Sequence, residues 1–204
     1  MLPKVDVAIK KSKKQIIVEE AARLFREKGF VGTTMRDLAS EVGMEAASLY
    51  NHIRSKDEIL IEICLSLANT YSAKMDEVYP SDYTPIGKIK KLIALHIQIN
   101  SMSSPLATVM NDEWRHLPEP TKTKFLDMRK RYEYQFTDII QQGIEKGEIK
   151  QLDPRITLYT LLSSVRWLQH WYHANRELDV KDIKDNIMEM FLSGLTDNQY
   201  EWKN

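Results

Sequence analysis

The sequence from residue 33 to residue 56 is TTMRDLASEVGMEAASLYNHIRSK. Thr34 and Asp37 form a T-x-x-D capping signature, which predicts the start of a short helix. Gly43 can end this helix in a left-handed turn, because glycine meets no steric penalty at positive φ. A second short helix is expected to begin near Glu45. Two short helices joined by a tight turn have the layout of a helix-turn-helix.

The second of these helices is expected to be apolar on one side only. Leu49 and Ile53 are one turn apart and can pack on Leu38 and Val42 of the first helix. Small side chains on the outside would allow close approach to the major groove of DNA, and polar ones would reach base edges or phosphates. The outer residues are of these kinds: Ala46, Ser48, Tyr50, Asn51 and His52. The pattern alone fits an ordinary helical hairpin with a polar outside equally well.

Together with the helix before it, the segment resembles the TetR family of transcriptional repressors over residues 14–60. The residues in that family's order and spacing are Ala22, Arg23, Leu24, Phe25, Gly29, Phe30, Thr33, Thr34, Asp37, Leu38, Ala39, Gly43, Leu49, Tyr50, His52, Ser55 and Lys56. The resemblance implies DNA contacts by Thr33, Thr34, Arg36, Glu45, Ala46, Ala47, Ser48, Tyr50, Asn51, His52 and Lys56. It departs from the family at Ile53, where an aromatic residue is usual, and at Ala47, where glycine is common.

Charge is distributed unevenly along the chain. The 204 residues carry no net charge, which alone argues against a nucleic-acid-binding protein. Residues 1–56, however, contain eleven Lys or Arg and seven Asp or Glu, a net +4, so residues 57–204 carry −4. The first part begins with a basic arm, either a solvated terminus or a phosphate-neutralising segment, that contains Lys4, Lys10, Lys11, Lys13 and Lys14. We expect a DNA-binding domain at residues 1–56 and a ligand-binding and dimerisation domain at residues 57–204.

Cysteine usage and hydropathy favour a soluble, cytoplasmic protein. The single cysteine, Cys64, excludes an internal disulfide and is compatible with a reducing compartment. No apolar signal region follows the start, and no run of about 18 uncharged apolar residues occurs. We therefore expect no membrane contact.

Helical periodicity continues to the end of the chain without a strand signal, so an all-α fold of about nine helices is expected. Beyond the helix-turn-helix, the expected helices span residues 13–28, 56–71, 86–102, 106–116, 121–146, 153–173 and 179–191. The helix that begins at Lys56 is apolar almost all round and must be covered on every side, which predicts a connector between the two domains. In the resembled family, the last two long helices form a four-helix bundle with those of a partner subunit. Here this implies a homodimer formed by Asp153 to His173 and Asp179 to Ser193.

The second domain gathers large apolar side chains with a few polar ones, which is typical of a small-molecule pocket and also of any helical core. The candidate ligand-binding residues are Met102, Met110, Trp114, Arg129, Tyr132, Phe136, Arg166, Trp167 and His170. Taken singly, each is more simply a core residue. The i,i+3 pair His170 and His173 could approach one metal ion, but no Cys or carboxylate pattern completes a site, so neither a metal nor another cofactor is expected.

This domain has a weaker resemblance of its own. NDEWRHL at residues 111–117, RKRYE at 129–133, GIEKGEI at 143–149 and WYH at 171–173 are similar to TetR-type regulators of lipid, fatty-acid or sterol breakdown that respond to acyl-coenzyme A thioesters. The resemblance implies a small-molecule effector, with a fatty acyl-coenzyme A as the first expectation. Arg129, Arg131 or Arg166 would meet its anionic part.

The sequence fits an enzyme or a helical scaffold less well than a DNA-binding regulator. An enzyme would need a nucleophile with a base, a metal cluster or a phosphate-binding loop, and neither G-x-S-x-G nor G-x-x-x-x-G-K-[ST] occurs. A helical scaffold or adaptor without DNA-binding activity would explain everything after residue 60. It would not explain residues 33–56.

Overall fold

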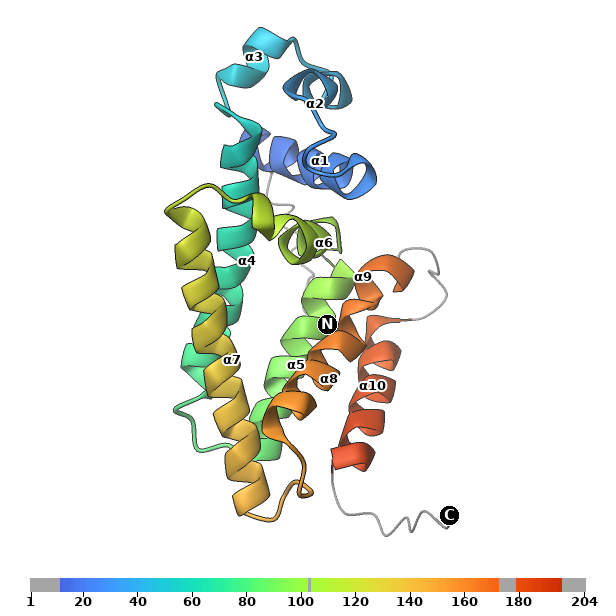
Figure 1. Ribbon diagram of the computed structural model, residues 1–204. Helices are drawn as coiled ribbons and strands as arrows, with labels where there is room; N and C mark the ends of the chain where they lie inside the picture. The colour runs from blue at the N-terminus through green and yellow to red at the C-terminus, as the bar shows by residue number, and fades with distance from the viewer. Residues whose placement is uncertain (1–11, 103, 173–178, 196–204) are drawn as a thin grey trace, which may run out of the picture.

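The computed structural model describes residues 12–102, 104–172 and 179–195, which form helices joined by turns, with no strand among them (Figure 1). Three helices form the upper end of the molecule in Figure 1: α1 (Lys13–Lys28), α2 (Met35–Glu41) and α3 (Ala46–Tyr50). The long helix α4 (Lys56–Val78) runs from this end into the lower part of the molecule.

The remaining helices are α5 (Pro85–Met102), α6 (Ser104–Glu113), the 3-10 turn η1 (Trp114–His116), α7 (Thr121–Glu145), α8 (Pro154–Arg166), α9 (Leu168–Trp171) and α10 (Val180–Leu195). Of these, α5, α6 and α7 pack on α4, and α8, α9 and α10 pack in turn on α5, α6 and α7. Helix α9 continues α8 after a break at Trp167, so the described ranges contain nine α-helical units. The predicted all-α class is confirmed.

The first helix has the bounds that its sequence predicts. Ser12 Oγ accepts a hydrogen bond from the Gln15 backbone N–H at 3.2 Å, and the Gln15 side chain accepts one from the Ser12 backbone N–H at 2.8 Å. These reciprocal bonds satisfy N–H groups that the first turn of a helix leaves without partners. At the other end, Gly29 adopts φ 77° and donates its N–H to the Phe25 carbonyl.

Two hydrophobic cores hold these helices together, and the upper one joins the two predicted domains. It contains residues of α1, α2, α3 and the first half of α4, together with Val109 from α6, Leu117 and Phe125 from α7. Fully burying such a side chain stabilises a fold by about 1.5–3 kcal/mol. The lower core is formed by the second half of α4 with α5, α7, α8 and α10. The boundary predicted at residue 56 therefore lies within a continuous core.

Several helix ends differ from their sequence-based expectations. Helix α4 continues seven residues beyond Tyr71, because Met75 and Val78 extend its buried stripe. The helix predicted from Asp153 to His173 is interrupted at Trp167, whose N–H bonds to the Val165 carbonyl. Helix α10 passes Gly194 and ends at Leu195, a buried residue whose carbonyl accepts the Lys150 N–H at 2.9 Å. His173 and most of the predicted basic arm, Lys4, Lys10 and Lys11, lie outside the described residues.

Candidate DNA-binding surface and ligand cavity

The predicted helix-turn-helix is formed by α2, a tight turn and α3. Thr34 caps α2: its Oγ1 accepts the Asp37 N–H at 3.1 Å, while Asp37 Oδ2 accepts the Thr34 backbone N–H at 2.8 Å and the Thr34 hydroxyl at 2.6 Å. The hydrogen bonds from Thr34 lower the pKa of the Asp37 carboxyl, because they stabilise its charged form. Gly43 lies in the turn at φ 65°, in the left-handed region that glycine enters without strain.

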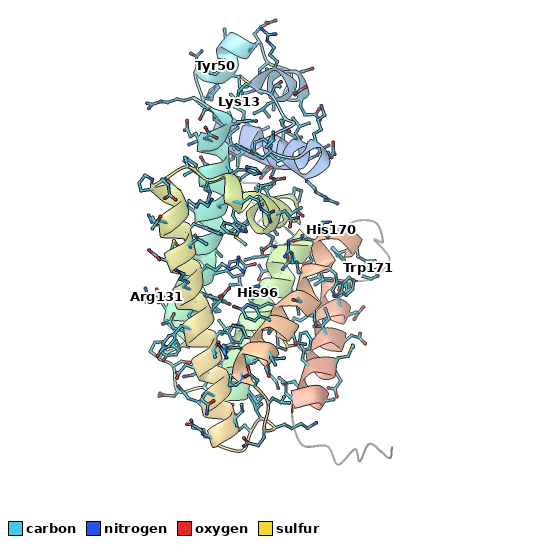
Figure 2. The ribbon with its side chains drawn as sticks, viewed as in Figure 1. Lys13, Tyr50, His96, Arg131, His170 and Trp171 are labelled. Carbon is cyan, nitrogen blue, oxygen red and sulfur yellow. The ribbon has the colours of Figure 1, made fainter. Side chains whose placement is uncertain are left out.

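One face of this unit is exposed and polar. Leu49 and Ile53 are buried against α2, with 0% and 1% exposure, whereas Tyr50 is 50% exposed. Figure 2 shows Tyr50 at the upper end of the molecule, far from His96. The other exposed residues from the predicted DNA-contacting set are Thr34, Arg36, Glu45, Ala47, Ser48, Asn51 and His52, and Ala46 is partly exposed. Their contact with DNA stays a prediction.

Two residues of the predicted set have structural roles in this conformation. Thr33 is 2% exposed, and its hydroxyl donates to the Gly29 carbonyl at 2.9 Å; its contact with DNA stays a prediction. The Lys56 ammonium donates to the carbonyls of Phe30 at 2.8 Å, Thr33 at 3.1 Å and Val31 at 3.3 Å. An ammonium has three donors, so a phosphate could bind Lys56 only by replacing or sharing one of these carbonyls.

A cavity of about 200 Å³ lies in the second domain, between α4, α5, α6, η1, α7 and α8. Its lining residues are Ala68, Tyr71, Ser72, His96, Asn100, Met110, Asn111, Trp114, Phe125, Met128, Arg129, Tyr132, Glu133, Tyr159, Leu162, Ser163 and Arg166. Nine of these residues are apolar or aromatic and eight are polar or charged, a more polar lining than that of most small-molecule sites and one that suits an amphipathic ligand.

The inner wall of the cavity carries a neutral polar cluster formed by Tyr71, His96 and Tyr132. The His96 ring stacks on Tyr71 with centroids 4.4 Å apart, and its Nε2 hydrogen-bonds the Tyr132 hydroxyl at 2.9 Å. Burial lowers the pKa of His96 to about 3 and raises the pKa of both tyrosines, because burial disfavours their charged forms. All three side chains are therefore uncharged at neutral pH. Figure 2 shows His96 surrounded by helices.

The outer wall of the cavity is charged. Arg129 Nε donates to Glu133 at 2.8 Å, and the Tyr159 hydroxyl donates to the other oxygen of Glu133 at 3.1 Å. Arg166 forms an ion pair with Asp112 of α6. Both arginines are about half exposed, with 49% and 50% of their side chains accessible. Exposed pairs of this kind contribute only about 0–1 kcal/mol to stability, so an anionic ligand could displace either acid with little loss.

Five of the nine predicted ligand residues line this cavity: Met110, Trp114, Arg129, Tyr132 and Arg166. The other four lie elsewhere. Phe136 is fully buried in the lower core, and Met102 is 67% exposed at the end of α5. Trp167 is 43% exposed and packs edge to face on Trp171, while His170 is exposed beside Gln169. Arg131 bonds Asp76, and Figure 2 shows it on the outer side of α7.

Other lining residues were absent from the predicted set. Tyr71 belongs to the apolar stripe of α4, and Tyr159 and Ser163 lie on the predicted dimerisation helix, on which only Arg166, Trp167 and His170 were expected to contact a ligand. A repeating i, i+4 pattern identifies a buried face but does not distinguish a filled core from a cavity. His96 and Asn100 carried a usable signal, since they place two polar groups one turn apart on an otherwise apolar face of α5.

A continuous series of contacts joins the cavity to the helix-turn-helix through η1. Trp114, in the first position of η1, lines the cavity and stacks on Phe125. His116, in the last position of the same turn, stacks on Phe30 with centroids 5.6 Å apart. The Phe30 ring lies 4.6 Å from the Lys56 ammonium, which also bonds the Thr33 carbonyl directly before the α2 cap.

Two family profiles match the chain. The profile described as bacterial regulatory proteins, tetR family, matches residues 17–63. A second profile, described as tetracyclin repressor-like, C-terminal domain, matches residues 82–195, more than half of the sequence. The chain belongs to the TetR family. The two TetR-family matches include the helix-turn-helix and most of the residues that line the cavity.

Individual TetR-family relatives resemble the chain over nearly its whole length. It is 24% identical over 188 residues to the transcriptional repressor KstR2 of Mycobacterium tuberculosis, covering 91% of this chain and 94% of KstR2. It is 22% identical over 188 residues to the fatty acid metabolism regulator protein of Bacillus subtilis, covering 91% and 97%.

Solved TetR-family structures have the same fold. The structure of the ketosteroid transcriptional regulator KstR2 of Mycobacterium tuberculosis aligns with a TM-score of 0.84 at 24% identity, covering 92% of this chain and 97% of that one. AibR in complex with isovaleryl coenzyme A and operator DNA aligns with a TM-score of 0.73 at 23% identity, covering 88% and 97%.

Residues 12–102, 104–172 and 179–195 contain neither a membrane-spanning helix nor a metal-binding cluster. No helix there is long and apolar enough to cross a membrane. No group of three or more His, Cys, Asp or Glu residues there could hold a metal ion.

Proposed function

We propose that this protein is a dimeric transcriptional repressor that binds a pseudo-palindromic operator and is released from it by a small amphipathic effector. The observation that carries the proposal is the contact series from the cavity through η1 to the α2 cap. It joins a space for a ligand to the exposed surface of a helix-turn-helix. A helical scaffold without DNA-binding activity would need neither part.

DNA binding would use the exposed faces of α2 and α3. Within this surface, Arg36 is the side chain that we expect to read a base, since a guanidinium can donate two parallel hydrogen bonds to one guanine. One α3 helix covers only a few base pairs, so useful affinity requires two subunits. Their half-sites would lie about one helical turn, or a multiple of it, apart.

The effector site would be the cavity. AibR was crystallised with isovaleryl coenzyme A, and the Bacillus subtilis relative is named for fatty acid metabolism, so an acyl-coenzyme A is the first candidate class. The cavity, at about 200 Å³, is smaller than the roughly 300–1,000 Å³ typical of sites that enclose a drug-sized ligand. It would take an acyl group or a single ring. The nucleotide part would stay outside, near Arg129 and Arg166.

Release from DNA requires that the effector favour one conformation over another, because a ligand that binds both equally shifts nothing. A ligand in the cavity would press on Trp114 and so move η1. His116 and Phe30 would pass this movement to the loop before α2, and the start of α4 at Lys56 would follow. The two recognition surfaces of a dimer would then be wrongly spaced for the operator.

The test of the proposal is a gel shift with a labelled fragment from the region upstream of the protein's own gene. Wild-type protein should retard the fragment and release it when the effector is added. Arg36→Ala should weaken binding to that fragment by about 1–3 kcal/mol and change binding to unrelated DNA far less. Lys130→Ala, which removes an exposed positive charge from α7, is the matched control. Failure of the wild type to prefer any upstream fragment would contradict the proposal, and equal losses on both DNAs would contradict base reading by Arg36.

A further inference from the structure

One buried acceptor in the cavity wall has no partner. Asn100 is 3% exposed and lines the cavity; its Nδ2 donates to the His96 carbonyl at 2.8 Å, but its Oδ1 has no hydrogen-bond partner among the described residues. Exchanging the two amide atoms would set Oδ1 against that carbonyl, so the hydrogen bond fixes the orientation. Buried polar atoms in native proteins are nearly always paired, and each exception requires an explanation.

The surroundings of Asn100 limit what that partner can be. His96 lies one turn before Asn100 on α5 and contacts Tyr71 and Tyr132 in the same cavity lining, and all three side chains are uncharged at neutral pH. The positive charges of the cavity lining, Arg129 and Arg166, are on its exposed side. A carboxylate or phosphate carried to the inner wall would thus meet a carbonyl oxygen without a compensating cation. Burial of an unpaired charge is far more unfavourable than burial of a neutral polar group.

We propose that the effector is an amphipathic anion with a hydrogen-bond donor, a hydroxyl or an amide N–H, at the end remote from its charge, and that this donor binds Asn100 Oδ1. The anionic end stays at Arg129 and Arg166. The inference rests on the proposed function, since it takes the cavity as the effector site. It narrows the effector from any acyl compound to one whose far end carries a donor. A saturated alkyl end leaves Oδ1 unpaired.

The test uses three probes of the same chain length and direct binding to the full-length protein. Octanoate ends in a methyl group, 8-hydroxyoctanoate ends in a donor, and 8-methoxyoctanoate ends in an ether that accepts hydrogen bonds but donates none. Binding is followed by tryptophan fluorescence, because Trp114 lines the cavity. The wild type should bind 8-hydroxyoctanoate on the order of tenfold more tightly than either of the other two, the ratio expected for one well-formed hydrogen bond.

Two leucine variants locate the preference. Asn100→Leu has nearly the same shape without the acceptor, and it should bind octanoate at least as well as 8-hydroxyoctanoate. Asn186→Leu is the matched control: it makes the same substitution at an exposed position of α10 outside the cavity lining, where the Asn186 Nδ2 donates to the Asp182 carbonyl at 2.8 Å as Asn100 does to that of His96. It should keep the wild-type preference. Thermal unfolding of both variants checks that each is folded before binding is compared.

The outcomes separate this inference from the proposed function. Equal binding of the three probes by the wild type, or an unchanged preference in a folded Asn100→Leu variant, would overturn the role of Asn100. If Asn100→Leu failed to fold, the affinities of the wild type for the hydroxyl, ether and methyl probes would still test the inference. Operator release is measured separately. Release without a hydroxyl preference would overturn only the donor inference, and a hydroxyl preference without release would overturn only the effector role of the cavity.

Discussion

Lys56 has a structural role in this conformation and a second, expected role on DNA. The family resemblance implies a DNA contact, which we expect to be to a phosphate, yet its three ammonium hydrogens are directed at the Phe30, Val31 and Thr33 carbonyls. Those carbonyls follow the end of α1 and precede the α2 cap, so Lys56 holds the loop between the two helices against the start of α4. Removing the Lys56 ammonium should therefore lower the stability of the fold as well as any affinity for DNA.

Lys56→Met is expected to lower the free energy of unfolding by about 1–3 kcal/mol, because partly buried carbonyls lose a charged donor. Urea denaturation of the variant beside wild type measures this change, with Lys130→Met on the exposed face of α7 as the control. A Lys56→Met protein as stable as wild type but weaker on every DNA sequence would instead assign Lys56 to phosphate binding alone.

His96 should make stability depend on pH. Its pKa is about 3 in the folded protein and near 6.5 in an unfolded chain, so between these values the unfolded chain binds one more proton. The free energy of unfolding therefore rises with pH in this window, by up to about 1.4 kcal/mol per pH unit. This contribution is fully present above the unfolded pKa and is lost as pH falls toward the folded pKa.

His96→Gln supplies the comparison, because glutamine can still bond the Tyr132 hydroxyl but does not titrate. Between pH 6.5 and pH 4 its unfolding free energy, measured by chemical denaturation, should fall less steeply than that of wild type. Parallel curves for the two proteins would show that another group controls this range.

At the scale of elements, η1 is the part that we expect to connect effector and operator. His116→Ala removes the ring that stacks on Phe30 and leaves Trp114 in the cavity wall. The variant should bind the effector with little change but release the operator at a higher effector concentration, on the order of tenfold, as expected when a coupling of about 1–3 kcal/mol is weakened. Fluorescence titration and gel shift on the same samples separate the two steps.

Arg115→Ala is the control for this experiment. Arg115 lies in the same turn and is exposed. Its side chain is not part of the series of contacts that joins Trp114 to Phe30. Normal release by His116→Ala would remove η1 from the mechanism and leave α4 as the route.

Local signals predicted the elements well where one residue controls a helix end. Thr34 with Asp37 predicted the start of α2, and Gly43 predicted the turn after it. The end of α4 and the break at Trp167 have no such signal. They depend on which residues find apolar neighbours in other helices, information that is spread over the whole chain.

The candidate sites divide in the same way. The exposed face of α3 can be predicted from one short segment, because Leu49 and Ile53, four residues apart, mark the buried side. The cavity requires side chains from six elements to leave a space, and no periodic pattern records a space. Phe136 and Tyr132 share one face of α7, one turn apart, yet only Tyr132 reaches the cavity.

At the scale of the whole molecule, the expected dimer surface is the outer side of α8 and α10. Not every apolar residue of these helices is available for it, since Leu162 lines the cavity and Ile187 is 8% exposed in the lower core. The large apolar side chains that α8 and α10 leave open include Ile156, at 69% exposure, and Met190, at 75%. If α8 and α10 present these side chains on one side, they form the kind of exposed apolar patch that another subunit covers.

Ile156→Glu combined with Met190→Glu should give a folded monomer that no longer binds the operator, because two desolvated carboxylates would oppose association. Size-exclusion chromatography with light scattering gives the mass, and gel shift gives DNA binding. Tyr134→Glu, which changes a 72% exposed aromatic on α7, should remain like wild type. A double variant that stays dimeric would place the subunit contact elsewhere.

The upper core limits how the DNA-binding domain of this protein could be exchanged for that of another regulator. Val109, Leu117 and Phe125 complete the packing around α1, although they lie far beyond the helix-turn-helix in sequence. A fragment that ends at Lys56 would lack these residues and the first half of α4, and would expose the apolar side of its own helices to water. A stable chimaera would also need residues in α6 and α7 that pack against the new DNA-binding domain. We therefore expect that replacing residues 1–56 alone would give an unstable protein.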